Sequence, residues 1–418
     1  MTQRANWSGT VPFAQPVIRP SSLDEVRAAV RSHDHVTALG TAHSFSPVAV
    51  GPGVQVATTD LPMSLAIADD RRTVTLGAGT TYAVLGPALQ SQGLALAAMA
   101  SLPHISVGGA VATGTHGSGD RIGTLSSAVR AIEIVTADGD VLWVSRDDDR
   151  DFVGSVVAVG ALGIVTRATL TVEPTYDIAQ SVLVGLDLDV VEEQFDAVFS
   201  AATSVSVFTR WRPEPDAQLW LKRRVDREGA WAGQPDFGAT PSQMKMHPLE
   251  LLDPVHCTEQ GGVAGAWFER LPHFRAEFTP SSGDEIQAEY LLPREHAVEG
   301  IRLMRSMHAR ITPLLHVTEI RTMCADDLWL SPAYGRDTVG IHFTWHKDAR
   351  IFEVLPAIEE ALLPLGARPH WGKVTVASPA AIAAAYPRMS DFADLAHRID
   401  PQGKFLSPLM SALISTVG

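Results

Sequence analysis

A glycine-rich segment in the first third of the chain constrains the fold most strongly. Residues 101–123 read SLPHISVGGAVATGTHGSGDRIG and contain six glycines in 23 residues. Glycine loses more conformational freedom on folding than any other residue, so this density indicates backbone that turns sharply or approaches a ligand closely. Loops of this kind direct successive N–H groups at an anion and bind phosphate without basic side chains. We therefore predict a main-chain binding site for a pyrophosphate-bearing cofactor.

The amino-acid composition narrows the class of protein. The 418 residues include 33 Lys and Arg against 47 Asp and Glu, a net charge of −14, which leaves no basic face for nucleic acid or an anionic membrane. With 45% hydrophobic and 19% charged residues a sizeable core can form, and no apolar stretch approaches the ~18 residues of a membrane span. Cys257 and Cys324 are too few and too isolated for a disulfide framework. We expect a globular, monomeric, cytoplasmic protein with no nucleic-acid or membrane partner.

Local signals predict a mixture of helices and strands. The capping-box pattern Ser22-x-x-Glu25 opens an amphipathic helical segment, and residues 35–39 read as a short strand. Two hairpins are expected to turn at residues 69–72 and 137–140. These signals indicate an α+β fold.

A predicted strand followed by Gly77-Ala-Gly79 invites comparison with the dinucleotide-binding fold. In that fold a third glycine follows, and an acidic residue about 20 positions later binds the ribose. Here Tyr82 replaces the third glycine, and no acidic residue occurs between it and Asp120. A sharp turn between strand and helix explains these glycines, so we expect no dinucleotide-binding fold.

Histidines recur in glycine-rich surroundings. His43 lies in the loop GTAHSF at 40–45, and His104 and His116 lie in the glycine-rich segment. Their spacings match no familiar zinc or iron motif, and no carboxylate recurs beside them, so no metal site is predicted. The residues alone leave open whether these histidines are structural or whether His43, at least, serves a cofactor.

Three later segments repeat polar side chains with a period of two, which on strands places them on one face. These are Glu319-Ile-Arg321, His342-Phe-Thr344-Trp-His346 and Trp371-Gly-Lys373. Such a face is either solvated or the polar wall of an active site. The aromatic neighbours on the opposite face suggest a sheet that is covered there, which favours the wall.

Long motifs along nearly the whole chain carry a family resemblance. The chain resembles the flavin oxidases of the vanillyl-alcohol oxidase family in GTAHSF at 40–45, MASLPHISVGGAVATGTHGSG at 99–119 and DPQGKF at 400–405. Within that family it is most similar to the alditol oxidases, also described as xylitol oxidases. This closer resemblance rests on TEIRT at 318–322, LSPAYGRDTV at 330–339, HFTW at 342–345 and RPHWGK at 368–373.

The resemblance implies a two-domain FAD-linked oxidase of the α+β class. An α+β FAD-binding domain would span residues 1–175 and be completed by residues 385–418. A substrate-binding cap domain with a large antiparallel sheet would span residues 176–384 and cover the flavin.

For the cofactor, the resemblance implies FAD joined covalently to His43 as an 8α-histidyl flavin. A neutral imidazole is a competent nucleophile for such a bond, and the linkage prevents cofactor loss. The residues expected to bind FAD are Gly40, Thr41, Ala42, His43, Ser44, Ser101, Ser106, Gly109, Thr113, Gly114, His116, Gly117 and Ile164.

For the substrate, the resemblance implies a polyol such as xylitol or sorbitol. Its terminal C1 hydroxyl would be oxidised to the aldose while O2 is reduced to H2O2. Arg321 and Lys373 would polarise that hydroxyl and stabilise the developing alkoxide, with His342 as a further candidate for proton handling. The residues expected to contact the polyol are Ser101, Glu319, Arg321, Thr344 and Lys373.

Two alternatives remain at this point. A sugar-1,4-lactone oxidase or dehydrogenase on the same fold would share His43 and the glycine-rich loops. Ala100 precedes Ser101 where a group larger than glycine can slow O2 access in this family, which keeps dehydrogenase behaviour open. A non-catalytic carbohydrate-binding protein would instead use the tryptophans of the second part of the chain, and it would be colourless.

Overall fold

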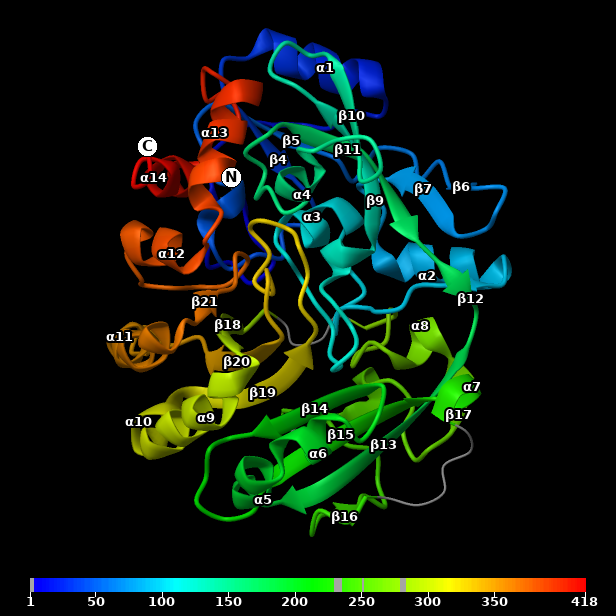
Figure 1. Ribbon diagram of the computed structural model, residues 1–418, viewed down its shortest axis with the longest axis vertical. Coiled ribbons are helices and arrows are strands. Elements are labelled where there is room, and N and C mark those ends of the chain that lie inside the picture. Colours follow the sequence, from blue (N-terminus) through cyan, green and yellow to red (C-terminus); the bar gives the residue numbers. More distant parts are fainter. Residues whose placement is uncertain (1–3, 229–234, 250–251, 279–282) are drawn as a thin grey trace.

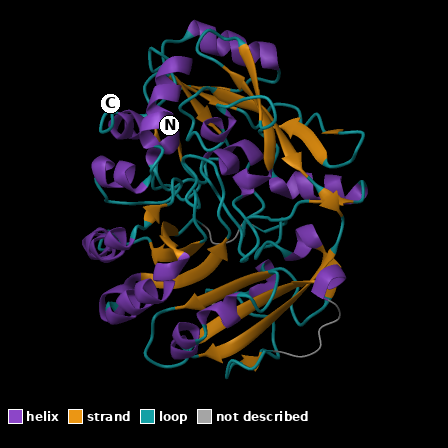
Figure 2. Cartoon of the chain, viewed as in Figure 1, coloured by secondary structure: helices purple, strands orange, loops and turns teal. Residues whose placement is uncertain are grey.

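The protein has two parts, one above the other in Figures 1 and 2. The computed structural model describes residues 4–228, 235–249, 252–278 and 283–418. The upper part holds the N-terminal segments, coloured blue to cyan in Figure 1, and the C-terminal helices, coloured orange to red. The lower part is built on one broad sheet whose strands run through the green and yellow segments.

The N-terminal residues form a small parallel sheet with one helix beside it. Its strands, in order, are β3 (Val17–Ile18), β5 (Val54–Ala57) and β4 (Val36–Leu39). Helix α1 (Leu23–Ser32) begins where the sequence predicts, because the Ser22 hydroxyl accepts a hydrogen bond from the Glu25 N–H at 3.3 Å. Val26 of the helix and Val56 of the sheet share one core.

The larger sheet of the upper part is antiparallel. Its strands, in order, are β10 (Val141–Ser145), β9 (Val129–Val135), β11 (Ile164–Thr171), β7 (Thr73–Gly77) and β6 (Ala66–Ile67). Both predicted hairpins are present, as β6–β7 and β9–β10. Strand β7 runs antiparallel to β11 and leads into α2 (Tyr82–Ser91). Gly77-Ala-Gly79 therefore turns between strand and helix outside any doubly wound parallel sheet.

A nine-stranded antiparallel sheet forms the lower part. Its strands lie in the order β16 (Thr240–Pro241), β13 (Asp177–Leu186), β15 (Ala217–Arg224), β14 (Ser204–Thr209), β19 (Leu315–Met323), β20 (Thr338–His346), β18 (Glu285–Pro293) and β21 (Arg368–Pro369), with β17 (Ala264–Ala266) beside β13. This is the large antiparallel sheet that the resemblance implies. The domain limits at 175 and 385 stay a prediction.

The two faces of this sheet carry different side chains. On β18, β19 and β20, apolar residues such as Tyr290, Ile320 and Phe343 alternate with polar ones, because successive strand residues point to opposite faces. The apolar face shares one core with the helices α5 (Leu188–Glu193), α6 (Phe195–Phe199), α9 (Ala297–Ser306) and α11 (Ile351–Leu362). The polar face is left to line a cavity.

The C-terminal residues return to the upper part. They form the helices α12 (Pro379–Ala385), α13 (Met389–Ile399) and α14 (Pro408–Ile414). The Lys404 ammonium group donates to the carbonyls of Val30 at 3.0 Å and Ala137 at 2.9 Å, and Phe405 is buried in the core beside α1. The DPQGKF motif thus ties the end of the chain to its beginning.

Two local predictions differ from the structure. The glycine-rich segment is not irregular throughout, since Val107–Ala112 forms the short helix α3. Small residues let this helix pack closely against the loop after β7, because a Cβ on Gly108 would lie only 2.9 Å from the Cβ of Ala78. The predicted strand at Trp371–Lys373 is a turn, because the Gly372 N–H donates to Nδ1 of His370 at 3.0 Å instead of to a neighbouring strand.

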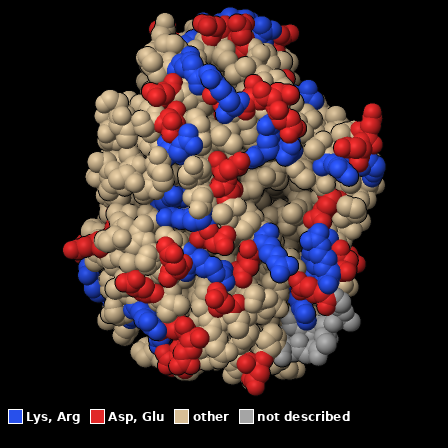
Figure 3. All heavy atoms as spheres, in the orientation of Figure 1, with Lys and Arg blue, Asp and Glu red and all other residues tan. Residues whose placement is uncertain are grey.

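Short elements complete the described chain. They are β1 (Arg4–Ala5), β2 (Pro12–Phe13), β8 (Leu94–Ala95), β12 (Glu173–Pro174), α4 (Phe152–Ser155), α7 (Val225–Glu228), α8 (Trp267–Arg270) and α10 (His308–Ile311), with 3₁₀ turns at 47–49, 125–128, 254–256, 294–296, 312–314 and 363–365. Within the described ranges, no helix has both the length and the apolar character needed to cross a bilayer. Acidic and basic side chains are interspersed on the face drawn in Figure 3.

Candidate active site

A large cavity lies between the glycine-rich loops of the upper part and the polar face of the nine-stranded sheet. Its upper wall comes from residues within 37–49, 100–116 and 155–165. Its lower wall comes from alternate residues of β18, β19 and β20 and from the turn at 370–373. The fold thus brings to this cavity every segment that carried a sequence motif except LSPAYGRDTV at 330–339.

His43 stands on the upper wall, in the loop after β4. Burial and the nearby His104 lower the pKa of its imidazole to about 4, so the ring is neutral at pH 7. The ring stacks on Trp7 with centroids 5.7 Å apart, and no group of the described residues hydrogen-bonds its buried Nδ1. A buried polar nitrogen needs a partner. A neutral, oriented imidazole of this kind fits the attachment of a flavin.

The loop that carries His43 also presents main-chain donors. Ala42 has a φ of 57°, a left-handed conformation that is uncommon outside glycine. Within the described chain, no protein acceptor meets the N–H groups of residues 41–44. Val107 and Gly108, by contrast, donate their N–H groups to carbonyls of the loop after β7. The His43 loop therefore offers free main-chain donors for an anion, whereas the N–H groups of Val107 and Gly108 at the start of α3 are tied to the protein.

Most residues predicted to bind FAD share this cavity. Its wall includes Gly40, Thr41, Ala42, His43, Ser44, Ser101, Ser106, Gly109, Thr113 and His116. The Ser106 hydroxyl is buried there without a partner among the described residues, and a Cβ on Gly40 would come within 2.5 Å of it. Unpartnered polar atoms beside a close-approach glycine fit a bound cofactor such as FAD.

Three of the predicted cofactor residues do not line this cavity in the described structure. They are Gly114, Gly117 and Ile164. The side chain of Ile164 packs in the core beside Phe405, whereas its neighbours Gly163 and Val165 line the cavity. Alternation along β11 explains the difference, since adjacent residues of a strand point to opposite faces.

On the lower wall, Arg321 is held between two carboxylates. Its Nη2 donates to Oε1 of Glu289 at 2.8 Å, and its Nε lies 3.5 Å from Oε2 of Glu319. Its Nη1 lies 3.4 Å from the Ser101 hydroxyl of the upper wall. Although burial opposes the charged form, the two carboxylates raise the pKa of Arg321, and Arg321 and His273 hold the pKa of Glu319 well below its usual range. Arg321, Glu289 and Glu319 are therefore all charged at pH 7.

Lys373 reaches the same centre from the turn after β21. Its ammonium group donates to Oε1 of Gln287 and lies 5.3 Å from the centre of the Phe45 ring. Burial lowers the pKa of Lys373 to about 8 and also lowers the pKa of His342, whose Nε2 lies 3.2 Å from the Thr344 hydroxyl. A cationic lysine, a neutral histidine and a hydroxyl therefore face the cavity together at pH 7.

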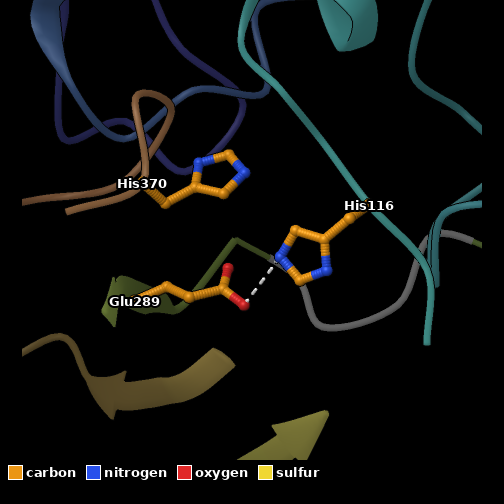
Figure 4. Close-up of side chains that lie close together, drawn as sticks. All are labelled: His116, Glu289 and His370. Carbon is orange, nitrogen blue, oxygen red and sulfur yellow. Dashed lines mark ion pairs between the residues drawn. The ribbon is translucent and has the colours of Figure 1, made fainter. Parts of the chain in front are cut away.

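Glu289 joins these groups, although the sequence analysis did not single it out. It lies opposite His342 in register, and Figure 4 shows its carboxylate between His116 and His370. Its Oε1 lies 3.1 Å from Nε2 of His116, and its Oε2 lies 3.1 Å from Nδ1 of His342. Burial alone would raise the pKa of this carboxyl, but Arg321 and the two histidines hold it well below its usual range. Glu289 is thus an anion shared by one guanidinium and two imidazoles.

The contact between Glu289 and His342 decides which nitrogen of the His342 ring carries the proton. A carboxylate can only accept, so Nδ1 of His342 carries the proton and Nε2 is left as an acceptor. The sequence held a signal for Glu289, because Glu285, Gln287 and Glu289 repeat with a period of two, like the polar residues of TEIRT and HFTW.

The same cluster has the composition of a metal site. Ligand atoms of His116, Glu289 and His370 lie within 4.8 Å of one another. A cation there would stand beside Arg321, which already donates to the same carboxylate oxygen, and Nδ1 of His370 already accepts from the Gly372 N–H. The geometry therefore favours Glu289 as the counter-ion of Arg321 over the three residues as metal ligands. The absence of a metal ion stays a prediction.

Comparison with known proteins places the chain in a family. Residues 14–145 match the FAD binding domain family, and residues 284–413 match the D-arabinono-1,4-lactone oxidase family. The alditol oxidase of a Streptomyces species is 45% identical over 99% of this chain and 99% of its own. The chain belongs to the alditol oxidase family. The L-gulono-1,4-lactone dehydrogenase of Mycobacterium tuberculosis is 28% identical over 96% of this chain and 97% of its own, and the L-gulonolactone oxidase of Mus musculus is 24% identical over 97% and 96%.

Solved structures agree on the fold. A cholesterol oxidase from Brevibacterium sterolicum superposes with a TM-score of 0.80 at 15% identity, covering 99% of this chain and 96% of its own. A solvent-stable cholesterol oxidase gives 0.78 at 17% identity, covering 99% and 97%. The predicted family and its two-domain FAD-linked α+β fold are confirmed. Together with the FAD-binding domain, family membership makes the chain an FAD-dependent oxidoreductase.

Proposed function

We propose that the protein is an alditol oxidase with covalently bound FAD, which oxidises the terminal C1 hydroxyl of polyols such as xylitol or sorbitol to the aldose and reduces O2 to H2O2. One observation carries the proposal: Glu289, His342 and Glu319 stand side by side in register on three neighbouring strands. Arg321 and Thr344 flank this row on the same face. Donors and acceptors in such a row can meet a chain of hydroxyls at several points. Full-length similarity to the Streptomyces alditol oxidase supports the same substrate class.

Each side chain of the site is assigned one role in the proposed reaction. FAD, when bound, would supply the acceptor for the hydride of C1 and the means of reducing O2. Arg321 and Lys373 hold the C1 hydroxyl and stabilise the negative charge that develops on its oxygen. Glu319 accepts hydrogen bonds from hydroxyls further along the polyol, and Ser101 and Thr344 complete the cradle. Nε2 of His342, unprotonated beside Thr344, is placed to take up the hydroxyl proton.

His43 is proposed as the covalent attachment site. Its neutral imidazole and unpartnered Nδ1 support this role. We expect the flavin of the purified protein to stay with the pellet after acid precipitation, and the flavin of a His43→Ala variant to move to the supernatant. His104→Ala, which alters a neighbouring histidine, serves as the control and should keep its flavin in the pellet. Flavin recovered wholly in the supernatant of the unmodified protein would refute the linkage.

The carbohydrate-binding alternative fits the structure poorly. Trp211, Trp220, Trp267, Trp345 and Trp371 are at most 4% exposed, so they pack the interior and offer no open platform for a sugar. A binding module also has no need for a guanidinium and an ammonium group held over a cavity with unpartnered polar atoms. The lactone alternative shares the fold, and the two lactone-oxidising relatives named above are less similar, at 28% and 24% identity.

The position of attack gives the proposed function a direct test. With xylitol or sorbitol and air, we expect an aldose and an equal amount of H2O2. The product should be an aldose because Arg321 and Lys373 would bind a terminal hydroxyl of the polyol. Chromatography of the product separates the aldose from the ketose that oxidation of an internal hydroxyl would give. A ketose product, or no product, would contradict the proposed orientation of the polyol.

We further propose that the enzyme is a monomer in the cytoplasm and that its partners are the polyol and O2. The proposed domains are the FAD-binding domain, residues 1–175 with 385–418, and the cap, residues 176–384. The acidic net charge of −14 supports the absence of a nucleic-acid partner.

A further inference from the structure

Lys222 is a buried lysine that the proposed chemistry does not use. It lies on β15 and is 1% exposed. Its ammonium group donates to the carbonyls of Leu271 and Pro272 and to Nδ1 of His273 at 3.1 Å. No carboxylate of the described residues is in direct contact with it, and such burial of a lysine is costly, so the groups that surround Lys222 indicate a purpose.

His273 connects this lysine to the cavity. Its Nε2 lies 2.8 Å from Oε1 of Glu319, and its ring stands edge-on to Phe208 and Trp220 with centroids 5.4 and 5.3 Å away. Its main-chain N–H donates to the carbonyl of Ser101 at 3.1 Å. The imidazole is therefore fixed by its backbone and by the two aromatic rings, with one nitrogen toward Lys222 and the other toward Glu319.

The donors and acceptors in this chain permit one arrangement. A carboxylate only accepts, so Nε2 of His273 carries the proton toward Glu319. Burial and the nearby Lys222 lower the pKa of His273 to about 4, so the ring is neutral and Nδ1 accepts from Lys222, whose own pKa is lowered by burial to about 7. Glu319 thus fixes the tautomer, and Lys222 satisfies the Nδ1 lone pair that this tautomer leaves.

We propose that Lys222 and His273 are positioning residues for polyol binding, because together they hold Oε1 of Glu319 and leave its Oε2, beside Arg321, to accept substrate hydroxyls. The inference rests on the proposed alditol oxidase function. It assigns a role to two residues that contact neither the reacting hydroxyl nor the flavin in the proposed chemistry. A wrong tautomer would place two acceptors 2.8 Å apart and turn the Glu319 carboxylate away.

Three variants of the holoenzyme test this role. Lys222→Met keeps the length of the side chain and removes the donor. His273→Gln keeps an acceptor toward Lys222 and a donor toward Glu319, whereas His273→Phe keeps only the ring between Phe208 and Trp220. We expect KM for xylitol to rise about 10–100-fold in Lys222→Met and His273→Phe, the loss typical of a hydrogen bond to a charged group, with kcat changed less than threefold. His273→Gln should recover most of the affinity.

A readout without substrate separates this inference from the proposed function. In protein with ¹⁵N-labelled histidine, the resonances of His273, identified by their loss in His273→Gln, should report the Nε2–H tautomer. Lys222→Met should keep this tautomer, because Glu319 still needs a donor, but it removes a nearby positive charge and should raise the pH at which the ring titrates. An unchanged titration of His273 in Lys222→Met, or a His273→Gln variant as impaired as His273→Phe, would overturn the inference. Failure of the unmodified protein to oxidise any polyol would count against the proposed function, and the titration of His273 would still decide the role of Lys222.

Discussion

Lys373→Met is expected to slow reduction of the bound flavin by xylitol about 10²–10³-fold while the flavin stays bound. The ammonium group faces the cavity from the turn at 370–373 and donates to Gln287, so methionine would fill the space without the charge. Stopped-flow absorbance under anaerobic conditions measures this step directly. Lys347→Met is the matched control, because Lys347 donates to the Ser8 carbonyl away from the cavity, and its flavin reduction should be unchanged. A full rate in Lys373→Met would remove this lysine from the mechanism.

The pH dependence of the same step reports the charge state of Lys373. Burial lowers its pKa to about 8, so the ammonium form dominates at pH 7 and is lost as the pH rises through about 8. If the charge stabilises the developing alkoxide, the rate of flavin reduction should fall above pH 8, and Lys373→Met should lack this fall. A rate that rises through the same range would instead assign Lys373 the role of a neutral proton acceptor.

Glu289→Gln is expected to lower the free energy of unfolding by about 3 kcal/mol, because breaking a buried ion pair leaves an uncompensated charge. Arg321 would keep only Glu319, whose nearest oxygen is 3.5 Å from its Nε. Glutamine offers one accepting oxygen in place of two, so either Arg321 or His342 would lose its acceptor, and flavin reduction should slow as well. Urea unfolding followed by circular dichroism, together with stopped-flow reduction, measures the two effects.

Glu359→Gln is the matched control for this substitution. Glu359 is also buried, on α11, but its partners among the described residues are neutral: the hydroxyls of Tyr290 and Thr375 and the N–H of Val376. Removing its charge leaves no guanidinium behind and should cost about 1 kcal/mol, the value of an ordinary hydrogen bond. Equal losses in the two variants would show that Glu289 acts as a buried polar group and not as the counter-ion of Arg321.

The strand-borne part of the site was predictable from local pattern. Glu319 and Arg321, and likewise His342 and Thr344, repeat with a period of two, and the structure places both pairs on one face of neighbouring strands. Lys373 lines the cavity as predicted, but it does so from a turn. Polar residues with a period of two do not distinguish a strand from a turn that a glycine such as Gly372 permits.

The groups that hold these residues leave a weaker signal in the sequence. Glu289 continues the period-two repeat of Glu285 and Gln287, but its partners on other strands are invisible to local pattern. Lys222 and His273 are 51 positions apart, and their contact depends on how β15 meets the segment after α8. Long-range contacts of this kind follow from tertiary packing, which neither composition nor periodicity specifies.

The choice between a polyol and an aldonolactone tests the central claim most directly. Oxygen consumption by the purified yellow protein should be measured with xylitol, sorbitol and mannitol against L-gulono-1,4-lactone and D-arabinono-1,4-lactone at equal concentration. We predict rapid uptake with at least one polyol, because the row formed by Glu289, His342 and Glu319 offers partners to an open chain of hydroxyls. Uptake with a lactone and none with any polyol would contradict the assignment.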